Sequence, residues 1–378
     1  MHFQTSFAIK TNNIFKYVLP IFGLSISSPQ RRYCRWLLLI TFILGLSCQL
    51  IVFIDIVFTI SVYLSLTKFD VEDILTSLSH ILIIPPAFFT YIYFYCRRFA
   101  ISSVLQKFSD LSSSKTFTKN QWREQICQTF LFTLLNLILI IAGLTTSINN
   151  QQFIEGGCIT RLIFEKYCKD PSTLAKLKIY FIVEIVFFNV FSHLFLSTIY
   201  CVFSHICTLL VSHFQQMDDK INRIINTKRI IISSDELSEF VKKILAGEKI
   251  ANEVSRIFSP ILLIWWFNIV VRICLLLRIF VYAWSGKFGG LIELLIEILR
   301  IYVLYKSVSD INKKAKSVGE NFTSLKLADG FRNNNFYFHL LSTQVGINVS
   351  DLFLINSQTI LTVMATIITY AVILFQTG

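Results

Sequence analysis

Long apolar segments separated by charged ones restrict what this chain can fold into more than any other feature. Seven such segments lie at about residues 36–66, 71–94, 126–148, 177–210, 257–284, 291–305 and 350–378. With 54% hydrophobic and 15% charged residues, the chain of 378 residues carries too much apolar surface for a soluble protein. It lacks the alternating segments of about ten residues that are typical of membrane β-barrels. The sequence therefore predicts an all-α membrane protein with seven transmembrane helices.

The distribution of Lys and Arg predicts which side of the membrane each connection occupies. If all seven segments cross the membrane, one side carries 25 of these residues and the other carries 7, while Arg272, Arg278 and Arg300 lie inside spans. The positive-inside rule then places the amino terminus in the cytoplasm and the carboxyl terminus outside, the reverse of a G-protein-coupled receptor. The sequons at Asn321 and Asn348 fall on the cytoplasmic side and should stay unglycosylated. Because the basic residues determine topology, no nucleic-acid partner is expected.

The fourth span is expected to continue as a helix far beyond the membrane. Residues 172–246 contain neither Gly nor Pro, and about fifty helical residues reach about 75 Å, whereas the hydrocarbon core is about 30 Å thick. Pro85-Pro86 is expected to kink the second span, and the basic, Ser-rich stretch 97–123 reads as a linker. The predicted organisation is a cytoplasmic amino terminus (1–35), spans one to four (36–210), a cytoplasmic helical extension (211–256), spans five and six (257–305), a cytoplasmic segment with a short helix (306–349) and the last span (350–378).

The chain offers no pattern for metal or cofactor chemistry. Its nine cysteines are dispersed, without a CxxC motif or a Cys/His cluster at metal-binding spacing. Cys158 and Cys168 lie in a segment predicted to be outside the cell, where they either form a disulfide or stay as free thiols. No acid, base and nucleophile converge at one depth, so we expect neither an enzyme nor a bound cofactor or metal.

Polar residues of the last apolar segment share one side of its predicted helix. They recur every three or four residues, together with one Ile, as Thr359, Thr362, Thr366, Thr369, Ile373 and Gln376. Facing lipid, these hydroxyl and amide groups would lack partners, so the stripe is expected to face other helices or water. The alternative is that the threonines bond back to their own helix or join it to its neighbours.

The end of this segment resembles the signature of insect gustatory receptors, in which Thr-Tyr is followed by five apolar residues and then Gln-Phe. Thr369-Tyr370, the apolar residues 371–375 and Gln376 fit this pattern, whereas Thr377 replaces the final aromatic residue. The chain length, the inverted seven-span layout and the sequence HFQQMDDKIN at 213–222 are also similar to that family. The resemblance is specific at the level of residues over about the last thirty-five positions.

This resemblance implies a ligand-gated, nonselective cation channel in the plasma membrane of gustatory neuron dendrites. Four identical or related subunits in the lipid bilayer would surround one pore lined by their seventh helices, and the cytoplasmic helices of spans four to seven would form an anchor that holds the tetramer together. Ile373 is expected to form the apolar gate, with Gln376 as the polar ring beside it. The pore and gate residues are then Thr362, Thr366, Thr369, Tyr370, Ile373 and Gln376.

The same family places its ligand pocket in the outer half of each subunit, among spans two to six. Arg278 and Glu293 flank the predicted turn at 285–290 and are expected to form an ion pair. The structural alternative for Arg278 and Glu293 is an ion pair that fixes their two helices, and for His80, Asn136 and Asn189 it is hydrogen bonding between helices. The polar residues at matching depth are His80, Asn136, Thr145, Glu184, Asn189, Arg278, Tyr282, Glu293 and Glu297.

The expected ligand is a small tastant. A bitter plant compound is favoured because the predicted pocket is not rich in the carboxylates and amides that bind sugar hydroxyls, and a sugar is the alternative. A metabotropic seven-span receptor is a competing function, which the membrane side of Gly378 would distinguish. A secondary transporter is disfavoured because the sequence shows no inverted repeat.

Overall fold

The computed structural model describes residues 19–24, 32–65, 82–111, 119–149, 179, 182–183, 186–226, 234–282, 288–323, 347–349, 353–354 and 357–377. His80, Cys158, Cys168, Glu184 and the predicted short helix at 336–344 lie outside these residues. The described part contains seven α-helices, which confirms the all-helical class: α2 (Arg32–Ser65), α4 (Ile84–Leu111), α5 (Lys119–Asn149), α9 (Phe195–Asn226), α10 (Ser234–Tyr282), α11 (Phe288–Thr323) and α13 (Ser357–Thr377).

Four smaller elements complete the described fold. A 3-10 turn, η1 (Leu19–Phe22), precedes α2, and a π-helical segment, η2 (Asn189–Leu194), leads directly into α9. Strands β1 (Asn348–Val349) and β2 (Phe353–Leu354) form an antiparallel pair in which Val349 lies opposite Phe353. This pair takes Phe353 and Leu354 out of the predicted last helix, so α13 begins at Ser357 and not at residue 350.

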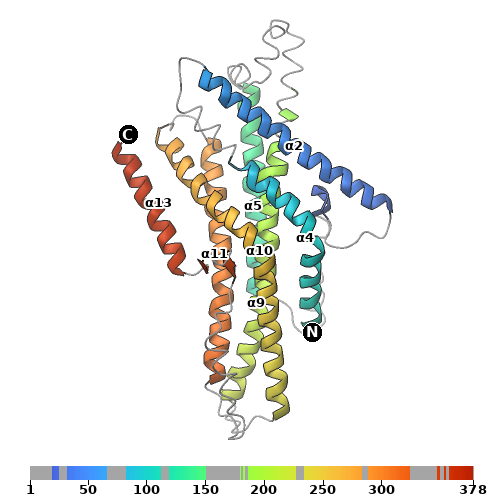
Figure 1. The fold of residues 1–378 in the computed structure, drawn as a ribbon. Helices are drawn as coiled ribbons and strands as arrows, with labels where there is room; N and C mark the ends of the chain where they lie inside the picture. The colour runs from blue at the N-terminus through green and yellow to red at the C-terminus, as the bar shows by residue number, and fades with distance from the viewer. Residues whose placement is uncertain are drawn as a thin grey trace.

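Helices α9, α10 and α11 run side by side and form the spine of the molecule (Figure 1). Helix α5 packs against α9 and α11, α4 packs against α10, and α13 stands at the edge of the bundle against α10. Of the helices that the structure describes, the three spine helices alone continue to the lower end of the view. We call this part, residues 211–226, 234–256 and 306–323, the projecting end.

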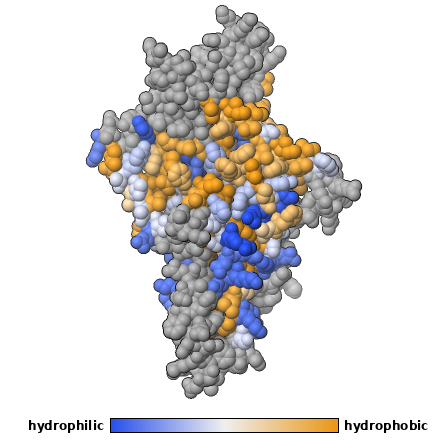
Figure 2. Space-filling view, in the orientation of Figure 1, coloured by the Kyte–Doolittle hydropathy of each residue, from blue (hydrophilic) through white to orange (hydrophobic). Residues whose placement is uncertain are grey.

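Four described helices are long and apolar enough to cross a membrane. These are 36–54 of α2, 121–145 of α5, 186–226 of η2 and α9, and 238–279 of α10, and α13 contains a shorter apolar stretch at 361–373. Figure 2 shows hydrophobic residues gathered above the projecting end, with hydrophilic residues below them. The structure therefore supports a multi-pass membrane protein.

Helix α4 begins at Ile84, with Pro85 and Pro86 in its first turn. Residues 71–81 of the predicted second span lie outside the described residues, so the expected kink or loosening at the prolines stays a prediction. The first turn tolerates proline because its backbone N–H groups have no partner within the helix. At the other end α4 continues through Leu111, well into the stretch predicted to be a linker. Ile101, Val104 and Phe108 recur at helical spacing there and are buried in the core.

The projecting end is more helical than the sequence suggested. Helix α10 has 49 residues and would extend about 74 Å at 1.5 Å per residue, as expected for a helix that leaves the membrane. Helix α11 also continues through the charged stretch to Thr323, because Val308, Ile311 and Val318 pack one side of it into the core. Asp218 on α9 accepts hydrogen bonds there from Ser317 at 3.0 Å and Asn321 at 2.7 Å.

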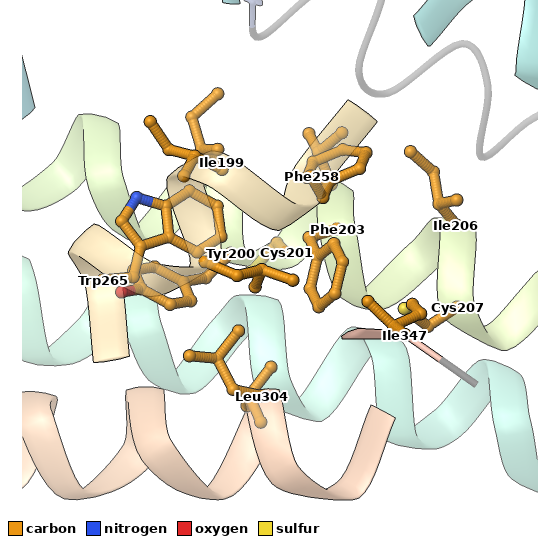
Figure 3. Close-up of a cluster of buried hydrophobic side chains, with 14 of the residues drawn as sticks. Ile199, Tyr200, Cys201, Phe203, Ile206, Cys207, Phe258, Trp265, Leu304 and Ile347 are labelled. Atoms are coloured by element: carbon orange, nitrogen blue, oxygen red, sulfur yellow. The ribbon is translucent and has the colours of Figure 1, made fainter. Parts of the chain in front are cut away.

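Aromatic side chains fill the centre of the spine. Phe203 of α9 packs on Phe258 of α10 with ring centroids 4.9 Å apart, and Tyr200 packs on Trp265 at 4.4 Å. Ile347, next to β1, is fully buried and lies beside this cluster, near Cys207 (Figure 3). Ile347 therefore fixes the segment that precedes α13 to the spine.

Gly45 allows α2 to approach the bundle closely. A Cβ atom added there would lie 2.5 Å from the hydroxyl oxygen of Tyr91 and 2.9 Å from the ring of Phe191. We predict that Gly45→Ala destabilises the protein by about 1–3 kcal/mol through overpacking, measured as a lower melting temperature of the detergent-solubilised protein. Gly289→Ala is the control, because the added methyl group would meet no atom within 4 Å. Equal melting temperatures of the two variants would contradict the tight contact.

Candidate functional site

The helix predicted to be the fourth span departs from α-helical geometry at η2, where Asn189 was predicted to line a ligand pocket. A π-helical turn changes which backbone groups are paired, and such turns are frequent at functional sites. The carbonyl oxygen of Phe191 accepts a hydrogen bond from the side chain of Gln49 on α2 at 2.6 Å. The carbonyl oxygen of His193 accepts bonds from Ser197 at 2.8 Å and from Arg300 on α11 at 3.0 Å. Side chains from two other helices thus stabilise this segment.

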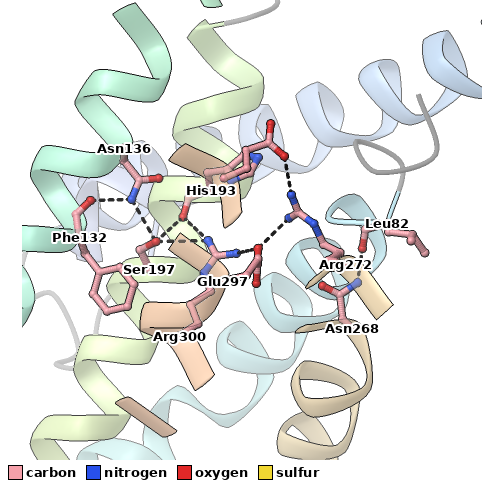
Figure 4. Close-up of polar contacts among 10 residues, drawn as sticks. Leu82, Phe132, Asn136, His193, Ser197, Asn268, Arg272, Glu297 and Arg300 are labelled. Atoms are coloured by element: carbon pink, nitrogen blue, oxygen red, sulfur yellow. Dashed lines mark hydrogen bonds and ion pairs between the residues drawn. The ribbon is translucent and has the colours of Figure 1, made fainter. Parts of the chain in front are cut away.

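A chain of alternating charges lies next to η2, between α10 and α11 (Figure 4). Arg272 of α10 binds Glu293 at 2.8 Å and Glu297 at 3.0 Å. Glu297 also binds Arg300 at 2.6 Å. Arg272 and Glu297 are 0% exposed, Arg300 is 1% exposed and Glu293 is 5% exposed. Four ionised side chains therefore meet inside the bundle, at a depth where charge is costly unless it is paired.

The spacing of the charges on α11 produces this chain. Glu293, Glu297 and Arg300 are separated by four and three residues, so they project from one face of the helix. That face is turned toward Arg272 on α10. Two carboxylates and two guanidinium groups cancel in formal charge, so their mutual attraction offsets part of the cost of taking them out of water.

Neutral polar groups extend the chain to two further helices. Asn136 of α5 donates to Ser197 of α9 at 3.1 Å and to the Phe132 carbonyl at 2.7 Å. The guanidinium group of Arg300 lies 5.6 Å from the ring centroid of Tyr200. The network, defined here as Asn136, His193, Ser197, Arg272, Glu293, Glu297 and Arg300, therefore joins α5, η2, α9, α10 and α11.

The structure brings some of the predicted ligand-binding residues together. Asn136, Glu293 and Glu297 belong to the network, and Asn189 is buried in the adjoining η2. Thr145 is exposed and donates to the Ala142 carbonyl of its own helix at 2.9 Å. Their role in ligand binding stays a prediction.

The remaining predicted residues have another partner or lie outside the described residues, and two arginines of the network were not predicted. Glu293 binds Arg272, whereas its expected pair with Arg278 stays a prediction. The side chain of Tyr282, like His80 and Glu184, lies outside what the structure describes. Arg272 and Arg300 were not among the predicted site residues, although two arginines inside apolar spans were a visible signal for a buried ionic network.

Helix α13 presents the predicted pore residues on its open side. Thr362, Thr366, Thr369, Ile373 and Gln376 are exposed in the single chain, and Tyr370 is half-buried. The opposite contact, with α10 and α11, uses Val363 and the buried Ile367. Thr362 and Thr366 donate to the carbonyls of Gln358 at 3.0 Å and Thr362 at 2.9 Å. The hydroxyl hydrogens of Thr362 and Thr366 are therefore used within their own helix, as the alternative prediction held. Their oxygens still face outward and can accept hydrogen bonds.

Among the residues that the structure describes, no group of three or more His, Cys, Asp or Glu side chains is arranged to hold a metal ion. The network contains two carboxylates, but both are bound by arginines at 2.6–3.0 Å. What this arrangement offers is a polar, charge-balanced centre within an apolar bundle, suited to hydrogen bonding and not to covalent chemistry.

We predict that Glu297→Gln destabilises the protein by about 3–5 kcal/mol, because two buried arginines would then share one carboxylate. The double variant Glu297→Gln/Arg300→Gln should recover part of this loss, because its charges balance again. Thermal melting of the purified variants measures both effects. Glu320→Gln, an exposed change on the same helix, is the control and should melt like the wild type. A double variant less stable than the single one would refute charge balance as the cause.

The chain shares its overall fold with solved receptor structures. It aligns with the insect olfactory receptor OR5 from Machilis hrabei in complex with eugenol at a TM-score of 0.71, with 12% sequence identity over 98% of both chains. A second structure of that receptor gives a TM-score of 0.67, again at 12% identity over 98% of both chains. The sequence matches no protein-family model and no curated protein. The chain therefore has the fold of an insect olfactory receptor, while the resemblance to gustatory receptors stays a prediction.

Proposed function

We propose that this protein is a chemoreceptor of the insect gustatory type that acts as a ligand-gated, nonselective cation channel. Four copies, or copies of related receptors, surround a pore in the plasma membrane. The observation that carries the proposal is the polar stripe of α13, which is exposed on the single chain and therefore requires a partner or water on its outer side. The fold shared with an insect olfactory receptor supports the same conclusion.

The three faces of α13 fit a pore helix. One face packs on α10 through Val363 and Ile367. A second face, with Thr362, Thr366 and Gln376, supplies polar groups to a hydrated path. A third face exposes apolar side chains, which suit a neighbouring copy or lipid: Leu361 at 69%, Met364 at 43%, Ile368 at 58% and Val372 at 47%. A helix with a polar and an apolar open face is expected where water lies on one side and hydrocarbon on the other.

The topology follows from the charge distribution, with the projecting end in the cytoplasm. In this arrangement the projecting ends of four copies anchor the tetramer. The carboxyl end of α13 then lies toward the extracellular side.

The ligand is proposed to bind in the outer half of the bundle, above the network of Arg272, Glu297 and Arg300. Movement of α10 and α11 would reach the pore directly, because α13 packs on both helices. A bitter plant compound is the favoured ligand, and a sugar is the alternative. The similar Machilis receptor was solved in complex with eugenol, which supports a small organic ligand.

A panel of bitter compounds and sugars should identify an agonist for cells that express this chain alone or with related receptors, read first by calcium imaging. In excised outside-out patches, that agonist should open a cation current within milliseconds, because the ligand site and the pore belong to one protein. A calcium response without current in excised patches, where cytosolic messengers are washed away, would indicate a metabotropic receptor and refute the channel.

We predict that Ile373→Ser raises the resting current severalfold, because a hydroxyl group hydrates the apolar ring that closes the pore. Val372→Ser is the matched control, since Val372 is similarly exposed but lies on the apolar face of the same helix. Whole-cell recordings at equal surface expression measure both variants. A wild-type resting current in Ile373→Ser would remove Ile373 from the gate.

A further inference from the structure

A polar cleft lies between α5, α9 and α11, where the apolar part of the bundle meets the projecting end. Its cavity volume is about 60 Å³ and it is open to its surroundings on one side, so it can receive a small charged group but not a whole drug-sized molecule. Nine of its ten lining residues are polar, the exception being Val211. The cleft is separate from the network around Arg272, and the proposed pore does not use it. Its lining is Gln121, Glu124, Gln125, Gln128, Ser204, Thr208, Val211, Lys306, Ser307 and Asp310.

The inner wall of this cleft is held in place by hydrogen bonds. Gln125 donates to Ser204 at 3.1 Å and to Thr208 at 3.0 Å. Ser204 donates to Gln128 at 3.1 Å, and Ser307 donates to Ser204 at 3.0 Å. Gln125, Gln128, Ser204 and Ser307 are each less than 10% exposed. The wall is therefore a fixed polar surface contributed by three helices.

The charges of the cleft suit a ligand with a positive and a negative group. Lys306 forms an ion pair with Glu124, and an ammonium group has three donors, so further donors are available to an anion. Asp310 lies one helical turn from Lys306 on the same face. Burial raises the pKa of Asp310 above its usual value, and nearby lysines lower it only in part. A cationic group placed beside Asp310 would therefore be stabilised.

Apolar side chains continue from the cleft toward the membrane. Tyr302 is one turn from Lys306, which lies 6.0 Å from its ring centroid, and it is 49% exposed. Leu131 follows Gln128 on the corresponding side of α5 and is 41% exposed. The polar cleft thus lies at the end of an apolar surface. This matches a phospholipid, whose polar headgroup lies at the membrane interface and whose acyl chains lie in the hydrocarbon.

We propose that this cleft binds the headgroup of phosphatidylethanolamine, with the ammonium group against Asp310 and the phosphate against Lys306. A primary ammonium group carries N–H donors that match the carboxylate, hydroxyl and amide oxygens of the lining. The trimethylammonium group of phosphatidylcholine lacks such donors and is bound by aromatic cages, whereas none of the ten lining residues is aromatic. In the proposed orientation of the channel the cleft faces the cytoplasmic leaflet, and this placement rests on the proposed function, whereas the chemistry of the cleft does not.

The test uses the full-length protein in nanodiscs of phosphatidylcholine alone or mixed with phosphatidylethanolamine. A lipid that binds the folded state raises its melting temperature, so the mixture should raise the melting temperature of the wild type by several degrees. Asp310→Asn should lose this increase while melting like the wild type in phosphatidylcholine alone. Asp219→Asn, an exposed change on α9, should keep the increase. Native mass spectrometry should show phosphatidylethanolamine retained by the wild type and not by Asp310→Asn.

The proposal is overturned if phosphatidylethanolamine gives no increase, or if Asp310→Asn keeps the wild-type increase. Soluble glycerophosphoethanolamine in phosphatidylcholine discs should have no effect, and an increase equal to that of the lipid would overturn a membrane source. If Asp310→Asn does not fold, Lys306→Gln takes its place, with Lys316→Gln, an exposed change on the same helix, as its control. These experiments measure lipid binding and not current. A negative result would therefore leave the channel proposal intact, and a protein that conducts no current could still bind the lipid.

Discussion

The requirement that buried charges neutralise one another governs the centre of this molecule. Arg272, Glu293, Glu297 and Arg300 alternate in sign, and every charge lies within 3.0 Å of an opposite one. Without water, no solvent reorganisation can compensate for a lost partner. The rotation of α10 and α11 about their axes is therefore restricted, because few orientations place all four groups in contact. Through Arg300 the same restriction reaches η2, whose His193 carbonyl depends on that guanidinium group.

Sequence reasoning succeeded where one physical signal dominated. Apolar content predicted the membrane class, and the absence of Gly and Pro after residue 172 predicted the long helix that becomes η2 and α9. Sequence reasoning failed for helices that are rich in charged residues but bury one apolar side in the core. Residues 97–111 and 306–323 looked like connections because they are rich in Lys, Arg and Ser, yet Ile101, Val104 and Val308 pack into the core. Average composition does not reveal a buried stripe that occupies only one side of a helix.

The site was predictable in its residue types but not in its pairing. Glu293 and Glu297 stand out as charges in an apolar segment, and so do Arg272 and Arg300. Which arginine meets which glutamate depends on the relative rotation and shift of α10 and α11, and these follow from packing across the whole bundle. The π-helical geometry of η2 was also not predictable, because Asn189–Leu194 contains neither Gly nor Pro. Its stability comes from Gln49 and Arg300, which are distant in sequence.

The π-helical turn sets how the part of the helix before η2 is rotated about the helix axis relative to α9, which follows it. One residue advances an α-helix by about 100°, so absorbing the extra residue of η2 into α-helical geometry would turn one half of the helix by about that angle relative to the other. Phe191, now packed beside Phe22 and Phe187, would then leave its position and another side chain would replace it. A single change of hydrogen-bond pattern would thus turn a different set of side chains of this helix toward its neighbours.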